Sequence, residues 1–230
     1  MIGIIGAMDI EVQKLKELLT DTKNEKISGV DFVSGKLGNA EVVVAKCGIG
    51  KVFAAICAEA MIMRYKPEIV INIGVAGGLS DKLKIGDIVI ADSVAQHDMD
   101  TTALGEEPGF LSEIKLVKIP ADKKAVETLK NACDTLSLRY EAGTIASGDQ
   151  FVSDFETKKR IQDTFSAKAC EMEGASIGQV CYVNNVPFGT LRAISDGAND
   201  NAKLDFPTFA ALAAENSVKV IKIFIDTFKR

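Results

Sequence analysis

Short apolar runs alternate with longer amphipathic segments along most of the chain. The first apolar run, Ile2–Gly6, is followed by Asp9–Thr20, in which valine and leucine recur on one face of a helix. Four further segments carry helical periodicity or helix-boundary residues: Lys51–Tyr65, Ala121–Leu136, Glu173–Val183 and Phe206–Phe228. Six further runs have the apolar or alternating pattern of strands: Val30–Leu37, Ala40–Lys46, Glu68–Ile73, Ile88–Ala91, Ala142–Ser147 and Phe188–Ile194.

Glycine and proline refine the predicted boundaries. A Gly38-Asn39 turn joins the second and third strands as a hairpin. The glycine-rich stretch Gly74–Gly78 is expected to lie between two buried strands. Pro207 falls in the first turn of the last predicted helix, where its missing N–H costs nothing.

The order of these elements predicts the fold class. Strands that alternate with helices indicate a three-layer α/β/α domain around a mixed, mainly parallel sheet. No linker, repeat or change of composition interrupts the chain, so we expect residues 1–230 to form one domain. In open α/β sheets ligands bind outside the carboxyl ends of the strands. Residues directly after the apolar runs are therefore the candidates for a site.

Composition and charge exclude several classes of protein. Apolar residues make up 47% and charged residues 26% of the chain, the average mixture of a folded protein rather than a disordered one. The 27 Lys and Arg are outnumbered by 32 Asp and Glu, and the basic run Lys158–Arg160 is flanked by acids, so no nucleic-acid partner is expected. The longest uncharged stretch, Gly174–Leu191, is interrupted by two asparagines and Pro187, which argues against a membrane span.

Cysteine and histidine content narrows the chemistry and the compartment. The five cysteines contain no CxxC pair and most have apolar neighbours, as buried reduced thiols do. The N-terminus lacks the basic region of a signal peptide, so we expect a cytoplasmic protein. His97 is the only histidine, which argues against a Ser-His-Asp triad and a histidine-rich metal site. Any catalysis is therefore expected to depend on carboxylates.

Three acidic residues follow predicted strands. Glu11 begins a helix after the first strand, Glu173 lies at another strand-to-helix junction, and Asp196 ends the strand Phe188–Ile194. Taken singly, each has an ordinary structural explanation, as a helix-start acid or as part of an Asp-Gly turn. Together they place three carboxylates at one edge of a sheet. Paired carboxylates with different pKa values suit cleavage of a bond to a sugar anomeric carbon.

The glycine-rich segments and the arginines bear on the second substrate. Gly74–Gly78 matches neither a Walker A loop nor a GxGxxG helix start, whereas Gly48–Lys51 opens a helix and could bind an anion. Only five arginines are present, and of these Arg192 alone lies in a strand expected to reach the site. A site that binds phosphate as co-substrate usually has more fixed cations. Water is therefore the predicted second substrate.

Six motifs, spread over nearly the whole chain, resemble those of bacterial 5′-methylthioadenosine/S-adenosylhomocysteine nucleosidases and follow in that family's order. They are Ile2–Met8 with Glu11, Cys47–Val52, Asn72–Leu79, Ser147–Asp149, Glu171–Glu173 and Arg192–Asp196. Purine-nucleoside and uridine phosphorylases are wider relatives that share the fold. The resemblance implies hydrolysis of the N9–C1′ bond of 5′-methylthioadenosine, S-adenosylhomocysteine and 5′-deoxyadenosine, in methionine salvage and methyl-cycle recycling. It also implies a homodimer without cofactor or metal.

The resemblance also implies roles for single residues. Asp196, assisted by Ser195, would protonate adenine N7, as a poor leaving group requires. Glu11 would activate the attacking water, with Arg192 nearby, and the cationic sugar would gain from the carboxylates. Glu173 and the Met172 backbone would hold the ribose hydroxyls.

Apolar residues complete the implied site. Phe151 would stack on adenine, and the Val152 backbone would read the base edge. The sugar and the 5′-thioalkyl group would contact three residues: Met8, Ile49 and Phe206. Without the resemblance, both phenylalanines could equally be core residues.

Two positions depart from the family pattern. Val75 stands where the family often has a hydroxyl residue, so secondary contacts to the water are expected to differ. Leu104 follows the His97-Asp98 segment where, in some relatives, an aromatic residue of a neighbouring subunit closes the 5′ pocket. The 5′ preference therefore stays open.

Three alternative functions remain at the level of sequence. A phosphorolytic transferase on the same fold is the nearest, and a hydrolase of futalosine or another adenosine derivative is the second. A non-catalytic nucleoside-binding protein would be expected to lack one of the three carboxylates, and all three are present.

Overall fold

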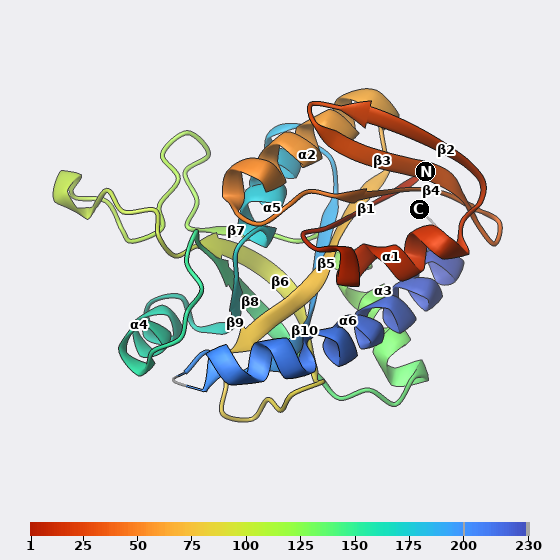
Figure 1. Ribbon diagram of the computed structural model, residues 1–230. Helices are drawn as coiled ribbons and strands as arrows, with labels where there is room; N and C mark the ends of the chain where they lie inside the picture. Colours follow the sequence, from red (N-terminus) through yellow and green to blue (C-terminus); the bar gives the residue numbers. More distant parts are fainter. Residues whose placement is uncertain (200, 229–230) are drawn as a thin grey trace.

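A computed structural model describes residues 1–199 and 201–228, which form a mixed sheet with helices on both of its faces (Figure 1). The helices are α1 (Asp9–Leu18), α2 (Lys51–Tyr65), α3 (Lys123–Thr135), α4 (Phe155–Phe165), α5 (Gly174–Val183) and α6 (Ala202–Thr227), with a 3-10 turn, η1 (Thr102–Leu104). The strands are β1 (Ile2–Gly6), β2 (Thr20–Ile27), β3 (Val30–Leu37), β4 (Ala40–Lys46), β5 (Ile69–Gly78), β6 (Ile88–Gln96), β7 (Lys118–Pro120), β8 (Tyr140–Ser147), β9 (Ala167–Glu171) and β10 (Phe188–Asp196). The predicted α/β class is confirmed.

The sheet has two parts. Strands β5, β10, β6, β8 and β9 pair in a closed ring, and β1, β4, β3 and β2 extend from β5 as an open sheet. The pairs β1–β5, β1–β4, β5–β10, β6–β8 and β8–β9 are parallel, while the hairpins and the β10–β6 and β5–β9 pairs are antiparallel. Antiparallel pairing therefore has a larger share than the sequence predicts.

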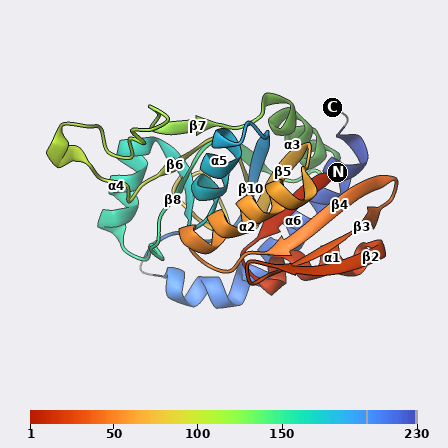
Figure 2. The same ribbon diagram turned by 90° about the horizontal axis from the view of Figure 1, so that it is seen from above.

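Helices cover the sheet from two sides. Helices α1, α3 and α6 pack together on one face, and α2 packs with α5 on the other (Figures 1 and 2). Every residue of β1, β5 and β10 is buried, which explains why these strands appear in the sequence as continuous apolar runs. Within the described ranges, no helix is long and apolar enough to cross a membrane.

Several predicted boundaries are wrong. Strand β5 continues through the glycine-rich stretch to Gly78, because those residues pair with β10 and β9 rather than forming a loop. Helix α6 begins at Ala202, so Pro207 lies inside the helix and not in its first turn. The additional first turn begins with a hydrogen bond from Ala202 N to the Asn199 carbonyl (2.8 Å), a helix start that the sequence pattern does not reveal.

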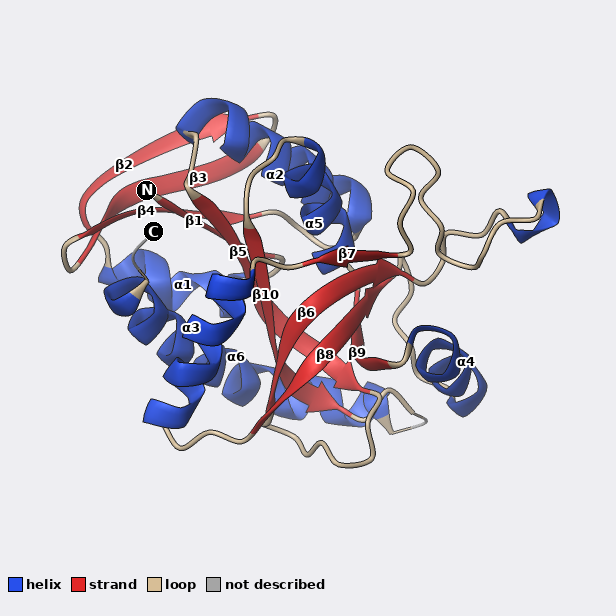
Figure 3. Cartoon of the chain, turned by 180° about the vertical axis from the view of Figure 1, so that it is seen from behind, coloured by secondary structure: helices blue, strands red, loops and turns tan. Residues whose placement is uncertain are grey.

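Four elements were not predicted, each for a local reason. Strand β2 is largely exposed and polar, since it forms the sheet edge beside β3. Strands β7 and β9 are too short to show a period. Helix α4 is strongly charged and is started by Asp154, whose side chain accepts a hydrogen bond from Thr157 N. Figure 3 shows a long loop around η1 that extends away from the sheet.

Candidate active site

One cavity of about 380 Å³ lies where β1, β5, β9 and β10 end. Eleven of the twelve predicted site residues line it: Met8, Glu11, Ile49, Val75, Phe151, Val152, Met172, Glu173, Ser195, Asp196 and Phe206. The cavity also has six lining residues that the sequence analysis did not assign to the site: Ala7, Ala76, Gly77, Gln150, Cys170 and Glu171. The strand-end rule thus selected residues that share one cavity.

Glu11 is held against the start of α1 and the middle of β5. Its Oε2 accepts hydrogen bonds from the backbone N–H of Ala7 (2.7 Å) and Met8 (2.9 Å), and its Oε1 accepts one from Val75 N (3.1 Å). The side chain is only 3% exposed. Burial raises the pKa of Glu11, and the opposing effects of Arg192 and of these amides are smaller. Glu11 is therefore fixed in place and able to accept a proton.

Asp196 ends β10 at a bulge and is surrounded by neutral partners. Its Oδ2 accepts a hydrogen bond from Ser195 Oγ (2.9 Å), and its Oδ1 accepts one from Ala198 N (2.9 Å). Burial raises the pKa of Asp196, and these two hydrogen bonds lower it by less. Lys158, whose charge has a small lowering effect on the pKa of Asp196, donates instead to the Gly197 carbonyl (2.9 Å). The carboxyl group thus favours its protonated form more than an exposed aspartate does.

The glycines of β5 explain how both carboxylates approach the sheet so closely. A Cβ atom at Gly74 would lie 2.5 Å from Glu11 Oε1, and one at Gly77 would lie 2.9 Å from Asp196 Oδ1. Any side chain at either position would displace a carboxylate. The glycine-rich segment therefore makes room for two carboxylates.

Glu173 lies just before α5 and is connected to the start of α2. Its Oε1 accepts a hydrogen bond from Gly50 N (2.9 Å), and its Oε2 is 3.9 Å from Arg192 Nη2. Burial, with the charge of Glu171 as the next cause, raises the pKa of Glu173 to about 8, against the opposing effect of Arg192. A proton bound near neutral pH lets Glu173 act as donor or acceptor toward a hydroxyl.

Arg192 does not lie where the sequence predicts, at the cavity surface. It is 1% exposed and does not line the cavity, but lies behind the wall, with Nη2 donating to Glu171 Oε2 and to Asn72 Oδ1 (2.5 Å). Glu171 belongs to the motif Glu171–Glu173, but the sequence assigns it no role. The motif does contain two acids on either side of Met172, and the sequence does not reveal which of the two contacts Arg192.

Apolar side chains form the rest of the cavity. The rings of Phe151 and Phe206 contact each other edge to face, with centroids 5.6 Å apart. Phe151 is 43% exposed, so it is not the core aromatic that a purely structural reading allowed. Leu104, on η1, is 83% exposed and lines no part of the cavity of this single chain. Among the described residues, no three His, Cys, Asp or Glu side chains are grouped to hold a metal ion.

Comparison with known proteins gives consistent matches along the chain. Residues 1–226 match the phosphorylase superfamily. The 5′-methylthioadenosine/S-adenosylhomocysteine nucleosidase of Shewanella loihica is 42% identical over 222 residues, which cover 96% of each protein. The alignment therefore extends over almost the whole chain rather than over a few motifs.

Solved structures of similar chains also match over almost the whole length of this chain. The 5′-methylthioadenosine/S-adenosylhomocysteine nucleosidase from Neisseria meningitidis, in complex with methylthio-immucillin-A, has a TM-score of 0.96 at 36% identity, with 99% of both chains covered. Futalosine hydrolase of Helicobacter pylori has a TM-score of 0.95 at 36% identity and covers 99% of this chain and 97% of that one. Backbone similarity alone does not separate these two activities.

Proposed function

Because the chain belongs to the 5′-methylthioadenosine/S-adenosylhomocysteine nucleosidases of the phosphorylase superfamily, as its motifs predicted, we propose that it hydrolyses the N9–C1′ bond of both nucleosides. The products are adenine and the 5-substituted ribose. 5′-Deoxyadenosine, which also carries an apolar 5′ group, is a further substrate. The observation that carries the proposal is the set of three buried carboxylates, Glu11, Glu173 and Asp196, around one cavity.

Asp196 is the general acid. Adenine leaves poorly as an anion, so a proton must reach N7 as the bond to C1′ breaks. The burial that raises the pKa of Asp196 supports this role, since it favours the protonated carboxyl and outweighs the opposing effect of its two hydrogen bonds. Ser195 orients the group through its hydrogen bond to Oδ2 (2.9 Å).

Glu11 is the general base that activates water. Three backbone amides fix its carboxylate, and burial raises its pKa, which makes it a better base than an exposed glutamate. The positive charge that develops on the sugar is stabilised by the nearby carboxylates. Val75 lines the same region but offers only its backbone N–H, which is already bonded to Glu11, so its side chain gives the water no hydrogen bond.

Glu173 and the backbone of Met172 bind the ribose hydroxyls. Phe151 stacks on adenine beside the Val152 backbone, and Met8, Ile49 and Phe206 contact the 5′-thioalkyl group. This division is supported by the lining of the cavity, which contains both carboxylates and apolar side chains. Arg192 acts from behind the cavity wall, where its charge offsets that of Glu171 and, at 3.9 Å, that of Glu173, which holds the sugar.

Product analysis tests the reaction class. The purified chain is incubated with 5′-methylthioadenosine in phosphate-free buffer and with added phosphate, and products are separated by chromatography. Free adenine and 5-methylthioribose should appear at equal rates in both. A sugar 1-phosphate as main product would instead make the chain a phosphorylase, and the Asp196→Asn variant serves as a matched low-activity control.

Futalosine is a second candidate substrate because of one specific observation. The futalosine hydrolase structure is as similar in fold and identity as the nucleosidase structures. Competition between futalosine and 5′-methylthioadenosine in one reaction measures the ratio of their kcat/KM values directly. We expect the methylthio substrate to be preferred, because the predicted 5′ contacts at Met8, Ile49 and Phe206 are apolar.

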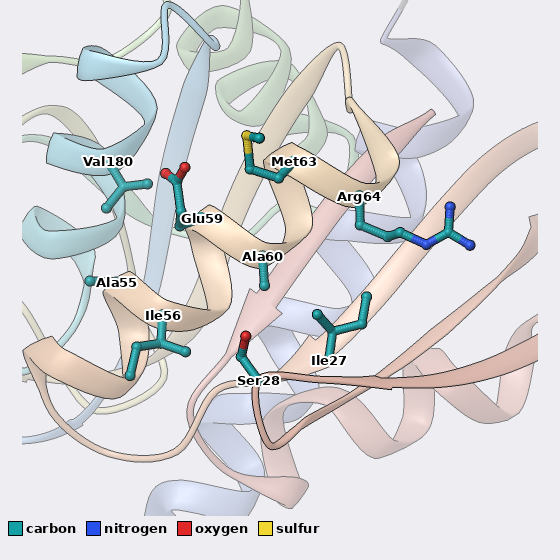
Figure 4. A pocket seen from close by; sticks show the side chains of 9 residues that line it. All are labelled: Ile27, Ser28, Ala55, Ile56, Glu59, Ala60, Met63, Arg64 and Val180. Carbon is teal, nitrogen blue, oxygen red and sulfur yellow. The ribbon is translucent and has the colours of Figure 1, made fainter.

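The active form is a homodimer, and the exposed faces of α2 and α5 support this. Four apolar side chains on α2 are 40 to 68% exposed: Val52, Phe53, Ile56 and Met63. A groove between α2, α5 and the turn at Ser28 lies beside them (Figure 4). Contiguous exposed apolar surface of this kind marks association sites. The face begins next to Ile49, so a second copy would meet the chain at the mouth of the cavity.

Light scattering tests the dimer. The wild-type chain should have twice the mass of its sequence at micromolar concentration, and Phe53→Asp should lower that mass toward the monomer. Leu212→Asp introduces the same charge at an exposed position on α6 and should leave the mass unchanged. A wild-type monomer at working concentration would contradict the dimer.

A further inference from the structure

Glu171 is a buried carboxylate at the end of β9 that connects three parts of the site. Its Oε1 and Oε2 both accept from Gly174 N (3.0 and 2.8 Å), and Oε2 also accepts from Glu173 N (3.1 Å). Ser147 Oγ, from the end of β8, donates to Oε1, and Arg192 Nη2, from β10, donates to Oε2. One side chain therefore joins β8, β10 and the start of α5.

These contacts determine where Arg192 lies. The guanidinium is buried, and its terminal nitrogens have four polar partners among the described residues: Glu171, Asn72, the Leu191 carbonyl and, at 3.9 Å, Glu173. Glu171 is the only carboxylate among the described residues within hydrogen-bond distance of it. A charge-assisted bond to a buried guanidinium restricts its position more strongly than neutral bonds do.

The same contacts determine where Glu173 lies. The Glu173 and Gly174 N–H groups, at the start of α5, have no partner within the helix and are bonded to Glu171 instead. Ser147 extends this support, because its Oγ accepts from Ala175 N (2.7 Å) while it donates to Glu171. Two residues of the cavity wall, Met172 and Glu173, are thus part of a short bend fastened to one carboxylate.

We propose that Glu171 is a positioning residue of the hydrolysis, which holds Arg192 and the start of α5 so that Glu173 meets the ribose. Glu171 itself lines the cavity but has its oxygens occupied by Ser147, Arg192 and the two backbone amides. It therefore acts through Glu173 and Arg192 rather than on the substrate. This role rests on the proposed function, because it assigns the ribose to Glu173.

Two substitutions separate the charge of Glu171 from its shape. Glu171→Gln keeps the size but removes the negative charge and replaces one acceptor by a donor, which would face Arg192 or a backbone N–H. Glu171→Asp keeps the negative charge, but its side chain is one methylene shorter, so the carboxylate lies farther from all of its partners. Ser147→Ala leaves Glu171 intact and removes two supporting bonds, the one to Glu171 and the one from Ala175 N, so it offers a milder variant should either change at Glu171 prevent folding.

Kinetics with 5′-methylthioadenosine give the first readout. We expect Glu171→Gln to lower kcat by about tenfold to a hundredfold, the range for small misplacements of a reacting group, with a smaller change in KM. The adenine and 5′ contacts at Phe151, Met8 and Phe206 stay in place, which is why binding should suffer less. Ser147→Ala should give a smaller loss of kcat in the same direction.

The titration of Glu173 gives a readout that a merely structural role would not change. Four ionisable groups act on Glu173 from the surrounding elements: Glu171, Arg192, Glu11 and Cys47. The charge of Glu171 raises the pKa of Glu173, so removing it should lower that pKa from about 8. Carboxyl-carbon NMR, with Glu173 assigned from Glu173→Gln, should show a lower midpoint in Glu171→Gln and a midpoint close to wild type in Glu171→Asp.

A matched control lies on the same strand. Thr190 is buried two residues before Arg192, and its hydroxyl has no hydrogen-bond partner within residues 1–199 and 201–228. Thr190→Val should therefore leave kcat and the Glu173 midpoint unchanged. Folded Glu171→Gln with kcat and a Glu173 midpoint equal to wild type would overturn the inference. Absence of cleavage by the wild-type chain would instead refute the proposed function, and the NMR comparison would still test the placement of Glu173.

Discussion

Asp196 and Glu173 are buried to a similar degree in one cavity, at 3% and 6% exposure, yet their surroundings differ in charge. Asp196 is hydrogen-bonded to a hydroxyl and an amide, and burial is the largest cause of its raised pKa, with a smaller contribution from the charge of Asp205. Glu173 lies between an arginine at 3.9 Å and a second glutamate. The same outcome, a raised pKa, arises chiefly from burial at both ends; at Glu173 the like charge of Glu171 is the second cause, whereas the hydrogen-bond partners of Asp196 are neutral.

This difference suits the chemistry of each end. A general acid must release its proton to adenine during the reaction, so a nearby cation that favours the ionised form would weaken it beforehand. The sugar end must instead hold several carboxylates together, which requires the Arg192 charge behind the wall. If the adenine end and the sugar end of the cavity act separately, substitutions at the two ends should have different effects.

Asp196→Asn should show the largest effect. Asn preserves the shape and can still donate a hydrogen bond, but it cannot transfer a proton, so cleavage of 5′-methylthioadenosine should slow by about 10²–10⁴-fold. Much of the loss should be recovered with a nitrophenyl thioriboside, whose leaving group needs no proton. Steady-state kinetics on both substrates check this, and an undiminished defect on the second would contradict the acid role.

Glu11→Gln should also be severely slowed, by about 10²-fold or more, because the water would lose its base. Here the defect should persist on the nitrophenyl thioriboside, since attack by water is still required. Equal recovery in the Glu11 and Asp196 variants would mean that the two ends do not divide acid and base roles. Fluorescence binding of 5′-methylthioadenosine serves as the control that both variants retain the site.

The 5′ substituent should have a moderate effect. Burying a methylthio group against apolar side chains contributes about 1–2 kcal/mol. Adenosine should therefore have a kcat/KM about tenfold or more below that of 5′-methylthioadenosine. The Asp196→Asn variant should keep the same ratio, because the 5′ contacts do not involve the acid. Equal kcat/KM values for the two nucleosides in the wild-type chain would exclude an apolar 5′ site.

The smallest effect concerns stability. The pKa of Asp196 is raised in the folded state, so its contribution to the free energy of unfolding is greatest below its unfolded pKa and is lost as pH rises through the folded value. Asn carries no ionisable group, so the Asp196→Asn variant avoids the cost of burying an ionised carboxylate. Its free energy of unfolding should exceed that of the wild type by about 1 kcal/mol at pH 8 and by little at pH 4. Urea unfolding at both pH values measures it, with the exposed Asp31→Asn as control.

Much of the fold and of the site could be predicted from the sequence, where local pattern carries the information. The fully buried strands β1 and β10 appear as apolar runs because both of their faces are covered. Glu11 and Asp196 could be selected because they lie shortly after or at the end of such a run, and Glu173 because it begins a predicted helix. The ends of parallel strands meet at one edge of a sheet. Eleven of twelve predicted site residues line the cavity for this reason, while their catalytic roles remain proposals.

Elements without a local period could not be predicted. Strand β2 is polar and exposed, and it exists because β3 offers it a hydrogen-bonding edge. The continuation of β5 through Gly74–Gly78 depends on pairing with β10 and on the need for space beside two carboxylates. Both outcomes depend on partners that are distant in the sequence.

The sequence by itself determined which acids stand at the strand ends and that one arginine lies among them. Only the tertiary structure decided how these charges are distributed, since it set Arg192 behind the wall against Glu171 and left Asp196 with neutral partners. The physical reason is that the proton affinity of a carboxyl group depends on its distance to other charges and on the exclusion of water around it. These distances and this burial are set only when β9, β10 and α5 pack together, so the residue types alone do not determine them.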